Sequence, residues 1–582
     1  MTLLPIADRE LRVSARNKAT HRLRILFAVG GVTIGGGNIF FSMRSGGVPA
    51  SQLGIWIFSV LKWIAFVFSC AAGIFLTSDC LSEEKREGTL GLLFLTDLRG
   101  YDVVLGKLLA TSLRTFYSLL AIFPVMALSF VLGGVAADDF QHTLLSLCNT
   151  LFFSLALGMV ISVISRDAHK AMTGTLGAML VFLFLIPGLD SLPLGRNAGV
   201  ARIGLLSPVF AFTHTSSYHA HDFWLSMLFV HLAGWSFLAI ASGLAPKTWH
   251  EKGARPSLGT GWHFPLFGPA GRSSGRRLLD KNPICWIISR DRWASNLARL
   301  AILLVLGVFA LSLASLSQSR GPATPASVAG ATSTGPTPTI SQNGTTTHTT
   351  HMFVLARGLT TNSQYRIANW CAHGLSLALE FWLAAHVCRF YIDGKRTGFL
   401  ELLLVTPIRP ADIFAGHWLA LRRLFLAPIA AQLLLTLACG AIQVCAFFPA
   451  GVAGAPGVTG SSPASLRLLD IVNILVLWVG LGAISWCIEL FTIVWFSIWM
   501  GITSKRINIA MLKTFWYAKV LPWFAGSFLL MFAFGSFFSV RAVWLWPVMF
   551  QGWFIGVDFA LIALARRRAY VALSKWSDLT AA

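Results

Sequence analysis

The chain has 582 residues, of which 55% are hydrophobic and only 12% are charged, and its mean hydropathy is +0.68. A charged share about half that of soluble domains excludes an ordinary soluble protein and indicates an integral membrane protein. The formal net charge of +22 would suggest nucleic acid in a soluble chain. No basic element with interleaved aromatic residues occurs here, so we expect no nucleic-acid partner.

The apolar runs predict an all-α integral membrane protein with about 12 transmembrane helices, because roughly 20 apolar residues cross a hydrocarbon core. In the first half the predicted spans lie near 23–42, 53–77, 104–134, 143–165, 171–190 and 223–244. In the second half they lie near 297–317, 369–391, 411–449, 472–500, 515–538 and 542–564. The runs 104–134 and 411–449 exceed one span, so part of each is expected to lie at the interface or to be broken.

The basic residues predict the orientation. Placing the N-terminus in the cytoplasm puts most of the 46 Lys and Arg residues on the cytoplasmic side, and the opposite orientation inverts that ratio. We therefore predict cytoplasmic N- and C-termini. Residues 1–22 are polar and basic, and no small-residue cleavage site follows the first apolar run, so that run is expected to be an uncleaved helix.

Composition divides the chain into two halves, 1–244 and 282–582, joined by a basic cytoplasmic linker rich in Gly, Pro and Ser at 245–281. A Ser/Thr-rich external loop at 318–365 is predicted to be disordered. The segment 282–290, like 5–12, is expected to form a helix along the cytoplasmic surface. The nine cysteines form no C-x-x-C pair, so we expect neither structural disulfides nor a metal site.

A repeated segment indicates that the two halves are a duplication. Lys85–Ala110 and Lys395–Ala420 align without a gap at an offset of 310, with 12 of 26 positions identical. A weaker repeat joins Ser165–Met172 to Ser504–Met511 at an offset of 339. Both repeats fall on the same predicted side of the membrane, which makes the halves parallel rather than inverted repeats.

The repeated segments, 82–102 and 392–412, have the character of a surface element. Each begins with charges, continues with a Gly and a Leu-rich helical turn, and ends with Thr-x-x-Arg and an Asp. Asp102 and Asp412 are expected to cap the next helices, beginning near Val103 and Ile413. A short apolar helix held at the surface suits docking into a groove on a soluble partner. An amphipathic turn resting on lipid headgroups suits the same residues.

The pattern resembles the hallmark of ABC-2 type transporter permeases, Glu-x-Arg/Lys-Glu-Gly-Thr-Leu-Glu-Leu-Leu-Leu-Thr-Pro-Leu followed by a helix with Gly-Lys. The chain resembles two such permeases fused, over essentially its whole length. The resemblance implies the ABC-2 type exporter fold with two parallel six-helix halves, a bacterial inner membrane, and an ABC ATPase subunit in two copies. The resemblance assigns coupling to this ATPase to Glu84, Arg86, Glu87, Gly88, Leu92, Thr96, Arg99, Asp102, Arg396, Gly398, Glu401, Leu402, Thr406, Pro407, Arg409 and Asp412.

The chain departs from the family pattern in both copies. Asp97 replaces the usual Pro, Gly91 a common Glu, Thr397 the Glu of the first copy, and His417 the Lys, so the two docking surfaces are expected to be unequal. No phosphate-binding loop occurs, because the segment 100–108 has five intervening residues and ends in Leu instead of Ser or Thr. We expect no catalytic, cofactor-binding or metal-binding residue in this chain; ATP and Mg²⁺ would bind to the partner.

Charged residues inside the predicted spans are costly and are therefore candidates for function. They are Lys62, Arg114, Glu380, Glu489 and Asp558. For each one, snorkelling or pairing within the bundle is the favoured role, and the set is scattered along the sequence. Two other functions stay open: a secondary transporter, which would need charges arranged to bind a coupling ion, and a membrane scaffold with a degenerate coupling element. An intramembrane enzyme would need a nucleophile–base pair, which we do not find in the sequence.

Overall fold

The computed structural model describes residues 50–95, 98–187, 203–215, 220–248, 283–289, 363–406, 408–447, 476–526 and 545–581, with isolated helical positions at 36, 303 and 307. Every regular element in these ranges is helical. Nine helices of the described residues are long and apolar enough to cross a membrane. This confirms the predicted all-α membrane fold.

The first half places five spans side by side. Its elements are α3 (Ala50–Ala72), η1 (Gly73–Thr77), α4 (Cys80–Glu87), α5 (Thr89–Leu95), α6 (Gly100–Leu120), α7 (Phe123–Val131), α8 (Ala137–Ile164), α9 (Ala168–Leu180), η2 (Val181–Leu185), η3 (Ile203–Leu206), α12 (Pro208–Thr213) and α13 (Ala220–Thr248). Helix α8 is the centre of this half, because it packs against α13 and α3 and most of its residues are buried.

The second half repeats this order in the described residues. Its elements are α15 (Pro283–Ser289), α18 (Ser363–Arg396), α19 (Phe399–Val405), α20 (Pro410–Phe447), η7 (Val476–Gly480), α22 (Leu481–Thr503), α23 (Ile507–Phe515), η8 (Trp516–Val520) and α25 (Leu545–Ala581). Helix α22 takes the place of α8 and packs against α25 and α18. Helix α15 falls on the predicted surface segment 282–290 and packs against α20.

The two long apolar runs fold differently. The run near 104–134 is interrupted at Ala121 and Ile122, between α6 and α7. The run near 411–449 is one helix, α20, which continues through Pro428. Its 38 residues span about 57 Å at a rise of about 1.5 Å per residue, so its excess length extends beyond the hydrocarbon core. The predicted spans 23–42 and 297–317 lie outside the described residues.

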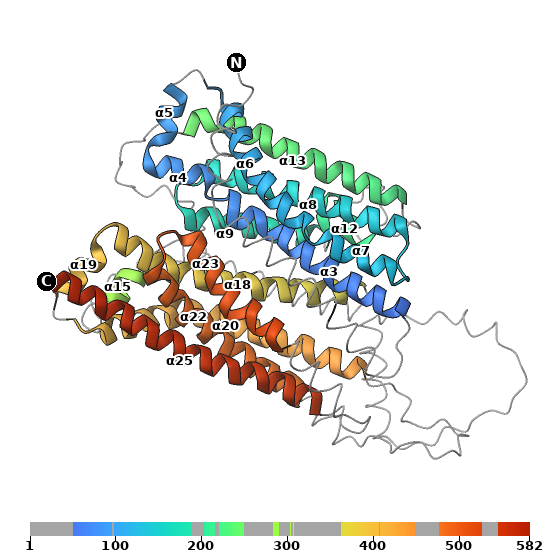
Figure 1. Ribbon diagram of the computed structural model, residues 1–582. Helices are drawn as coiled ribbons and strands as arrows, with labels where there is room; N and C mark the ends of the chain where they lie inside the picture. Colours follow the sequence, from blue (N-terminus) through green and yellow to red (C-terminus); the bar gives the residue numbers. More distant parts are fainter. Residues whose placement is uncertain are drawn as a thin grey trace, which may run out of the picture.

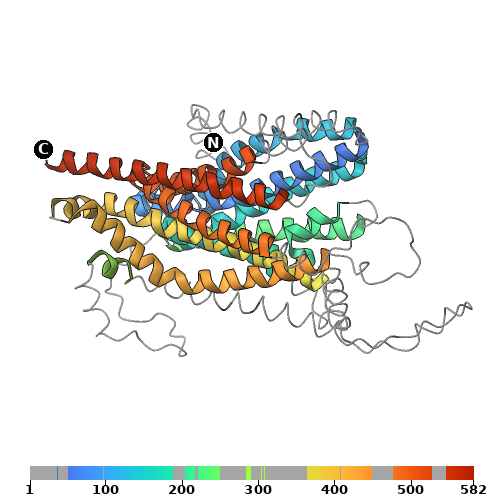
Figure 2. The same ribbon diagram turned by 90° about the horizontal axis from the view of Figure 1, so that it is seen from below.

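The halves lie beside each other with their long helices roughly along one direction, the first half above the second in Figure 1. Figure 2, seen from below, shows the same lengthwise arrangement. Contact between the halves runs through α18 against α9 and η2, and through α23 against η1 and α9. The halves therefore meet through α18, α9 and α23, which carry parts of the repeated sequence segments, and through their neighbours η1 and η2.

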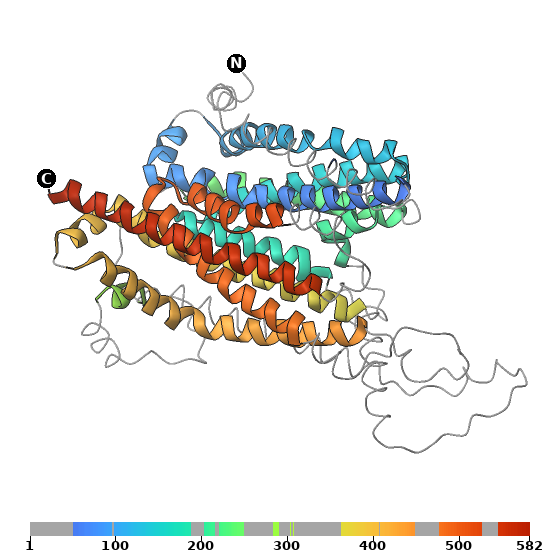
Figure 3. The ribbon, with the colours of Figure 1, turned by 60° about the horizontal axis from the view of Figure 1, so that its bottom comes forward.

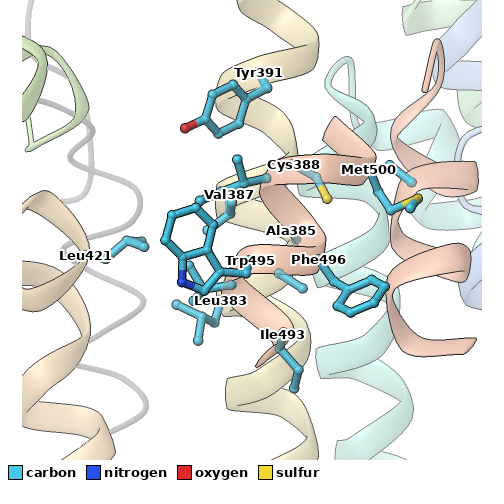
Figure 4. Packing of buried hydrophobic residues seen from close by; sticks show 14 of the residues in the cluster. Leu383, Ala385, Val387, Cys388, Tyr391, Leu421, Ile493, Trp495, Phe496 and Met500 are labelled. Atoms are coloured by element: carbon cyan, nitrogen blue, oxygen red, sulfur yellow. The ribbon is translucent and has the colours of Figure 1, made fainter. Parts of the chain in front are cut away.

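Each half is built around an apolar core, and the core of the second half also includes Ile74 and Met172 of the first. In the second half, Trp495 and Phe496 follow each other on α22 and point to different sides of the helix (Figure 4). Trp495 contacts Phe414 of α20 and Tyr570 of α25, with ring centroids 5.7 and 6.4 Å apart. Phe496 stacks near Tyr517 of η8 at 6.3 Å. One helical turn of α22 thus joins the three helices packed around it.

Candidate functional site: two duplicated surface helices

Each repeated segment turns sharply at a glycine in the left-handed conformation. The φ angle is 71° at Gly88 and 72° at Gly398. A Cβ atom at either position would meet nothing within 4 Å. The requirement for glycine therefore comes from the backbone angle itself, which costs L-residues energy, and not from crowding.

After the glycine, a short helix presents the same face in both copies. One leucine anchors each helix in the core: Leu90 is 2% exposed and Leu400 is 0% exposed. The residues two and five positions later point outward, and their exposed fractions are 63% for Leu92, 74% for Leu95, 71% for Leu402 and 72% for Val405. A spacing of three puts each exposed pair on one helix face. Each copy therefore offers a small apolar surface on an anchored helix.

Helices α5 and α19 lie at the same end of the molecule, hereafter the α5/α19 end. Figure 1 shows α5 at the left end of the first half and α19 at the left end of the second. The turned view in Figure 3 keeps both at that end. The duplicated apolar surfaces can thus face one partner assembly from the same side.

The helices that follow begin earlier than the sequence predicted. Helix α6 starts at Gly100 and α20 at Pro410, three residues before Val103 and Ile413. Asp102 is the third residue of α6, and its Oδ2 accepts the backbone N–H of Arg99 at 3.0 Å. The prediction that Asp102 and Asp412 stand before their helices was wrong, because the aspartate acts from inside the first turn, as in a capping box.

Two lysines that the sequence reasoning passed over tie each segment to its half. Lys85 donates to the carbonyl of Val163, at the end of α8. Lys395 donates to the carbonyls of Ile502 and Ser504, at the end of α22, at 2.6 and 2.7 Å. Val163 and Ile502 are equivalent positions, because they are 339 residues apart, which is the offset of the second repeat. In both halves, therefore, the lysine of the first repeat binds the chain just before the second repeat. A cation is favoured at the C-terminus of a helix.

In the first copy, a charged contact holds the segment onto α6. Lys107 Nζ lies 2.7 Å from Glu84 Oε1, and the Thr89 hydroxyl donates to the same carboxylate. Arg86 forms a forked pair with Asp79 at 2.8 and 3.1 Å. We call Glu84, Thr89 and Lys107 the charged latch.

In the second copy, aromatic packing replaces this latch. The equivalent positions are Gly394, Phe399 and His417. The His417 ring lies 5.1 Å from the Phe390 ring and stacks on Tyr391 at 5.4 Å. Lysine and its glutamate partner are thus replaced together, so different contacts hold the two segments onto their halves, and the departure at His417 belongs to this exchange.

The remaining predicted coupling residues are mostly on the surface. Exposed positions are Glu87, Gly88, Arg99, Arg396, Glu401, Thr406 and Arg409. Thr96 and Pro407 lie outside the described residues. Along the sequence, exposed charges flank the apolar residues of α5 and α19, and a polar rim around an apolar centre is typical of a protein interface.

Between the halves, near the α5/α19 end, lies a cavity of about 210 Å³ lined by charged side chains of both halves. Arg506 of the second half pairs with Glu83 of the first at 2.9 Å. Burial favours a higher pKa of Asp167 at the same cavity, but the hydrogen bond and charge of Lys170 and the charge of Arg389 outweigh it and lower the pKa. The ion pair between Arg506 and Glu83 thus joins the halves at this cavity.

Three intramembrane charges come together, contrary to the scattered set expected from the sequence. Lys519, at the end of η8, lies 2.5 Å from Glu380 Oε2 and 2.9 Å from Glu489 Oε1. Trp486 Nε1 donates to Glu380 at 2.9 Å. The sequence analysis missed Lys519, although its position in a predicted span was a signal. Helices α18, η8 and α22 bring the three together over a sequence distance that no local pattern reveals.

Lys62 and Arg114, two of the three remaining predicted charges of the membrane region, lie in the first half, away from this cluster. Lys62 donates to Thr215 Oγ1 at 3.0 Å and lies over the Phe212 ring at 4.7 Å. Arg114 is half-buried on α6 and forms no ion pair with the described residues. Pairing with polar and aromatic neighbours accounts for Lys62, as the favoured reading expected. Asp558 is considered with the cavity that it lines, below.

Two helical halves, each with a short apolar helix anchored at the same end, form a duplicated membrane unit. Residues 4–244 match the family model described as ABC-2 family transporter protein. This match over the first half supports an ABC-2 type permease, in agreement with the resemblance found in the sequence. The second half is joined to it by the two internal repeats. No curated protein matches the sequence closely enough to count as a relative.

Proposed function

We propose that the chain is the membrane-spanning subunit of an ATP-driven exporter, powered by a separate ABC ATPase subunit that docks in two copies on α5 and α19. The α5/α19 end then lies in the cytoplasm, as the distribution of basic residues predicts. ATP and Mg²⁺ bind to the ATPase. The observation that supports this most directly is the matched pair of exposed apolar faces, Leu92 with Leu95 and Leu402 with Val405.

These faces are large enough to contribute to docking. Full burial of a leucine or valine contributes about 1.5–3 kcal/mol, so covering side chains that are 63–74% exposed gives about 1–2 kcal/mol each. The exposed charges around them add orientation more than affinity. The helix-in-groove mode uses this combination of an apolar stripe and a polar rim.

Movement of a docked helix would reach the membrane through two connections in the first half. The anchor Leu90 lies in the core cluster, so α5 cannot shift without its neighbours. Helix α4 is bonded to α8, because the backbone N–H groups of Leu81 and Ser82 donate to Ser162 Oγ at 2.9 and 3.1 Å and Lys85 donates to Val163. Helix α8 in turn packs on α13 and α3. Closure of the two ATPases then moves the halves relative to each other and gives alternating access.

Site-directed crosslinking tests the docking. Cysteine replaces Leu92 in one variant and Leu402 in another. The matched control is Ser51→Cys, which changes an exposed residue near the start of α3. After gentle purification from the native membrane, we expect both surface-helix variants to crosslink to a soluble subunit with ATPase activity, and the Ser51 variant and the parent chain to give no adduct.

The stoichiometry and direction are tested in the same preparation. Two ATPase copies per chain are expected, and ATP added outside inverted vesicles should drive transport into the lumen. If no ATPase is recovered, even after crosslinking, docking is refuted and secondary transport or a scaffold role becomes the better explanation. If an ATPase is recovered but ATP drives efflux from inverted vesicles, the permease role holds and export is refuted.

A further inference from the structure

The second half has a partly open cavity of about 260 Å³ between α22, η8 and α25. Glu489 and Asp558 line it together with Lys519, and Trp486, Trp523 and Phe554 give it aromatic walls. Glu489 follows the start of α22 at Leu481 by about 12 Å and precedes its end at Thr503 by about 21 Å, at a rise of about 1.5 Å per residue. The cavity therefore lies deep within the membrane region.

The charges around this cavity do not balance. Lys519 is shared between Glu380 and Glu489. Asp558 is only 4% exposed, and no basic side chain of the described residues lies within ion-pair distance of it; its hydrogen-bond partner is Thr492. One ammonium group thus faces three carboxylates. Buried charges in a membrane protein are normally paired, so the described residues supply this site with too little positive charge.

The cluster is absent from the first half, although the scaffold there is the same. At the offset of 339, Thr150 stands at the position of Glu489 and Leu180 at the position of Lys519. The first half therefore folds around α8 without these charges. This argues against a purely structural need for the cluster in the shared fold.

We propose that this cavity binds a small organic cation, an amine or quaternary ammonium compound, against Asp558 and Glu489 and over the tryptophan rings. Aromatic faces attract such cations, and a volume of about 260 Å³ suits a molecule smaller than the drug-sized ligands of typical pockets. Among the described residues no group of His, Cys, Asp and Glu could hold a metal ion, which favours an organic cation over a metal. The inference that this cation is also the exported substrate rests on the proposed function. The inference that the cavity binds the cation does not rest on it.

The test measures binding to the purified full-length chain in nanodiscs without any ATPase, so its failure is distinct from failure of the proposed function. Radiolabelled choline and 3,3-dimethylbutan-1-ol, its neutral isostere, are compared by equilibrium dialysis. We expect saturable binding of choline at one site per chain and at least tenfold weaker binding of the isostere. Equal binding of the two compounds, or of neither, would overturn the proposal without any mutation.

Variants then locate the site. Asp558→Asn should weaken choline binding at least tenfold, Asp558→Glu should retain most of it, and Asp138→Asn, which changes an exposed carboxylate at the start of α8, should leave it unchanged. If Asp558→Asn does not yield a monodisperse protein, Glu489→Gln takes its place with the same expectation. Unchanged affinity in the well-folded variant, or displacement of choline by an equal concentration of Na⁺, refutes an organic-cation site at this cavity.

Discussion

The left-handed glycines at the start of α5 and α19 give the sharpest prediction. Gly88→Ala adds a Cβ atom that meets no neighbour within 4 Å, so the added cost is only the left-handed backbone angle, about 1–2 kcal/mol for an L-residue. This lowers the population of the native turn relative to competing conformations by about 5- to 30-fold. With the turn lost, Leu90 cannot stay buried in the core while Leu92 and Leu95 keep their exposed positions. Gly398→Ala should act alike on α19.

The assay is ATP hydrolysis by the copurified complex, with crosslinking at a cysteine in place of Leu92 as a second readout. Each alanine variant should lower the permease-dependent ATPase activity several-fold, and the double variant should abolish it. Gly88→Asn should retain more activity than Gly88→Ala, because asparagine tolerates the left-handed region. Gly243→Ala is the matched control, since a Cβ atom there also meets nothing but the residue lies in the regular helix α13.

The ranking of these variants decides the matter. If Gly88→Asn and Gly88→Ala are equally impaired, or if Gly243→Ala loses as much activity as either, the backbone angle is not what the segment requires. Unchanged ATPase activity in the double variant would falsify the role of these turns in coupling and would leave transport powered in another way.

Three further outcomes follow from the contacts between elements. Lys395→Met removes two charge-assisted hydrogen bonds at the end of α22 and should lower the free energy of unfolding by about 1.5–3 kcal/mol. Denaturant titration in detergent measures this loss. The control Lys505→Met, which changes an exposed lysine next to Ser504 in the sequence, should have little effect. Glu83→Lys should weaken the contact between the halves by about 0.2–1 kcal/mol, as for other exposed pairs, and Arg506→Glu in the same chain should restore the loss; failure of this swap would mean that the pair contributes nothing. Because the pKa of Asp167 is lowered from 3.8 in the folded chain, its carboxylate stabilises the fold above pH 3.8. This contribution disappears as the pH falls through the folded-state pKa. The Asp167→Asn variant should thus unfold at a lower temperature than the parent at pH 6, and at the same temperature at acid pH.

Local sequence patterns predicted the membrane-spanning helices and the positions of the two short surface helices well. Hydropathy located every span that the structure describes, and the repeat located both surface helices. The family resemblance singled out Leu92 and Leu402, and both are exposed on their short helices. The helix starts were misplaced by three residues, since Asp102 can cap from before the helix or from its first turn and the sequence does not separate these.

Contacts between distant segments escaped the sequence analysis. Glu380 and Lys519 are 139 residues apart, and only the packing of α18 against α22 and α23 brings them together. The same is true of Lys85 and Val163. The two repeats could have predicted this contact, because a pair of segments that is duplicated together can lie side by side in both halves. Each repeat was identified on its own, and the contact between them was not inferred.

The charged latch and its aromatic counterpart make the two arms of this permease respond differently to their surroundings. The Lys107–Glu84 contact is partly open to water, with side-chain exposures of 12% and 23%, and salt screens such a pair. The rings around His417, which is fully buried, instead pack more tightly in salts that strengthen apolar association. A salt that strengthens apolar association should therefore weaken the Lys107–Glu84 contact and strengthen the packing around His417. The attachment of the two segments to their halves could thus be changed independently in a single chain.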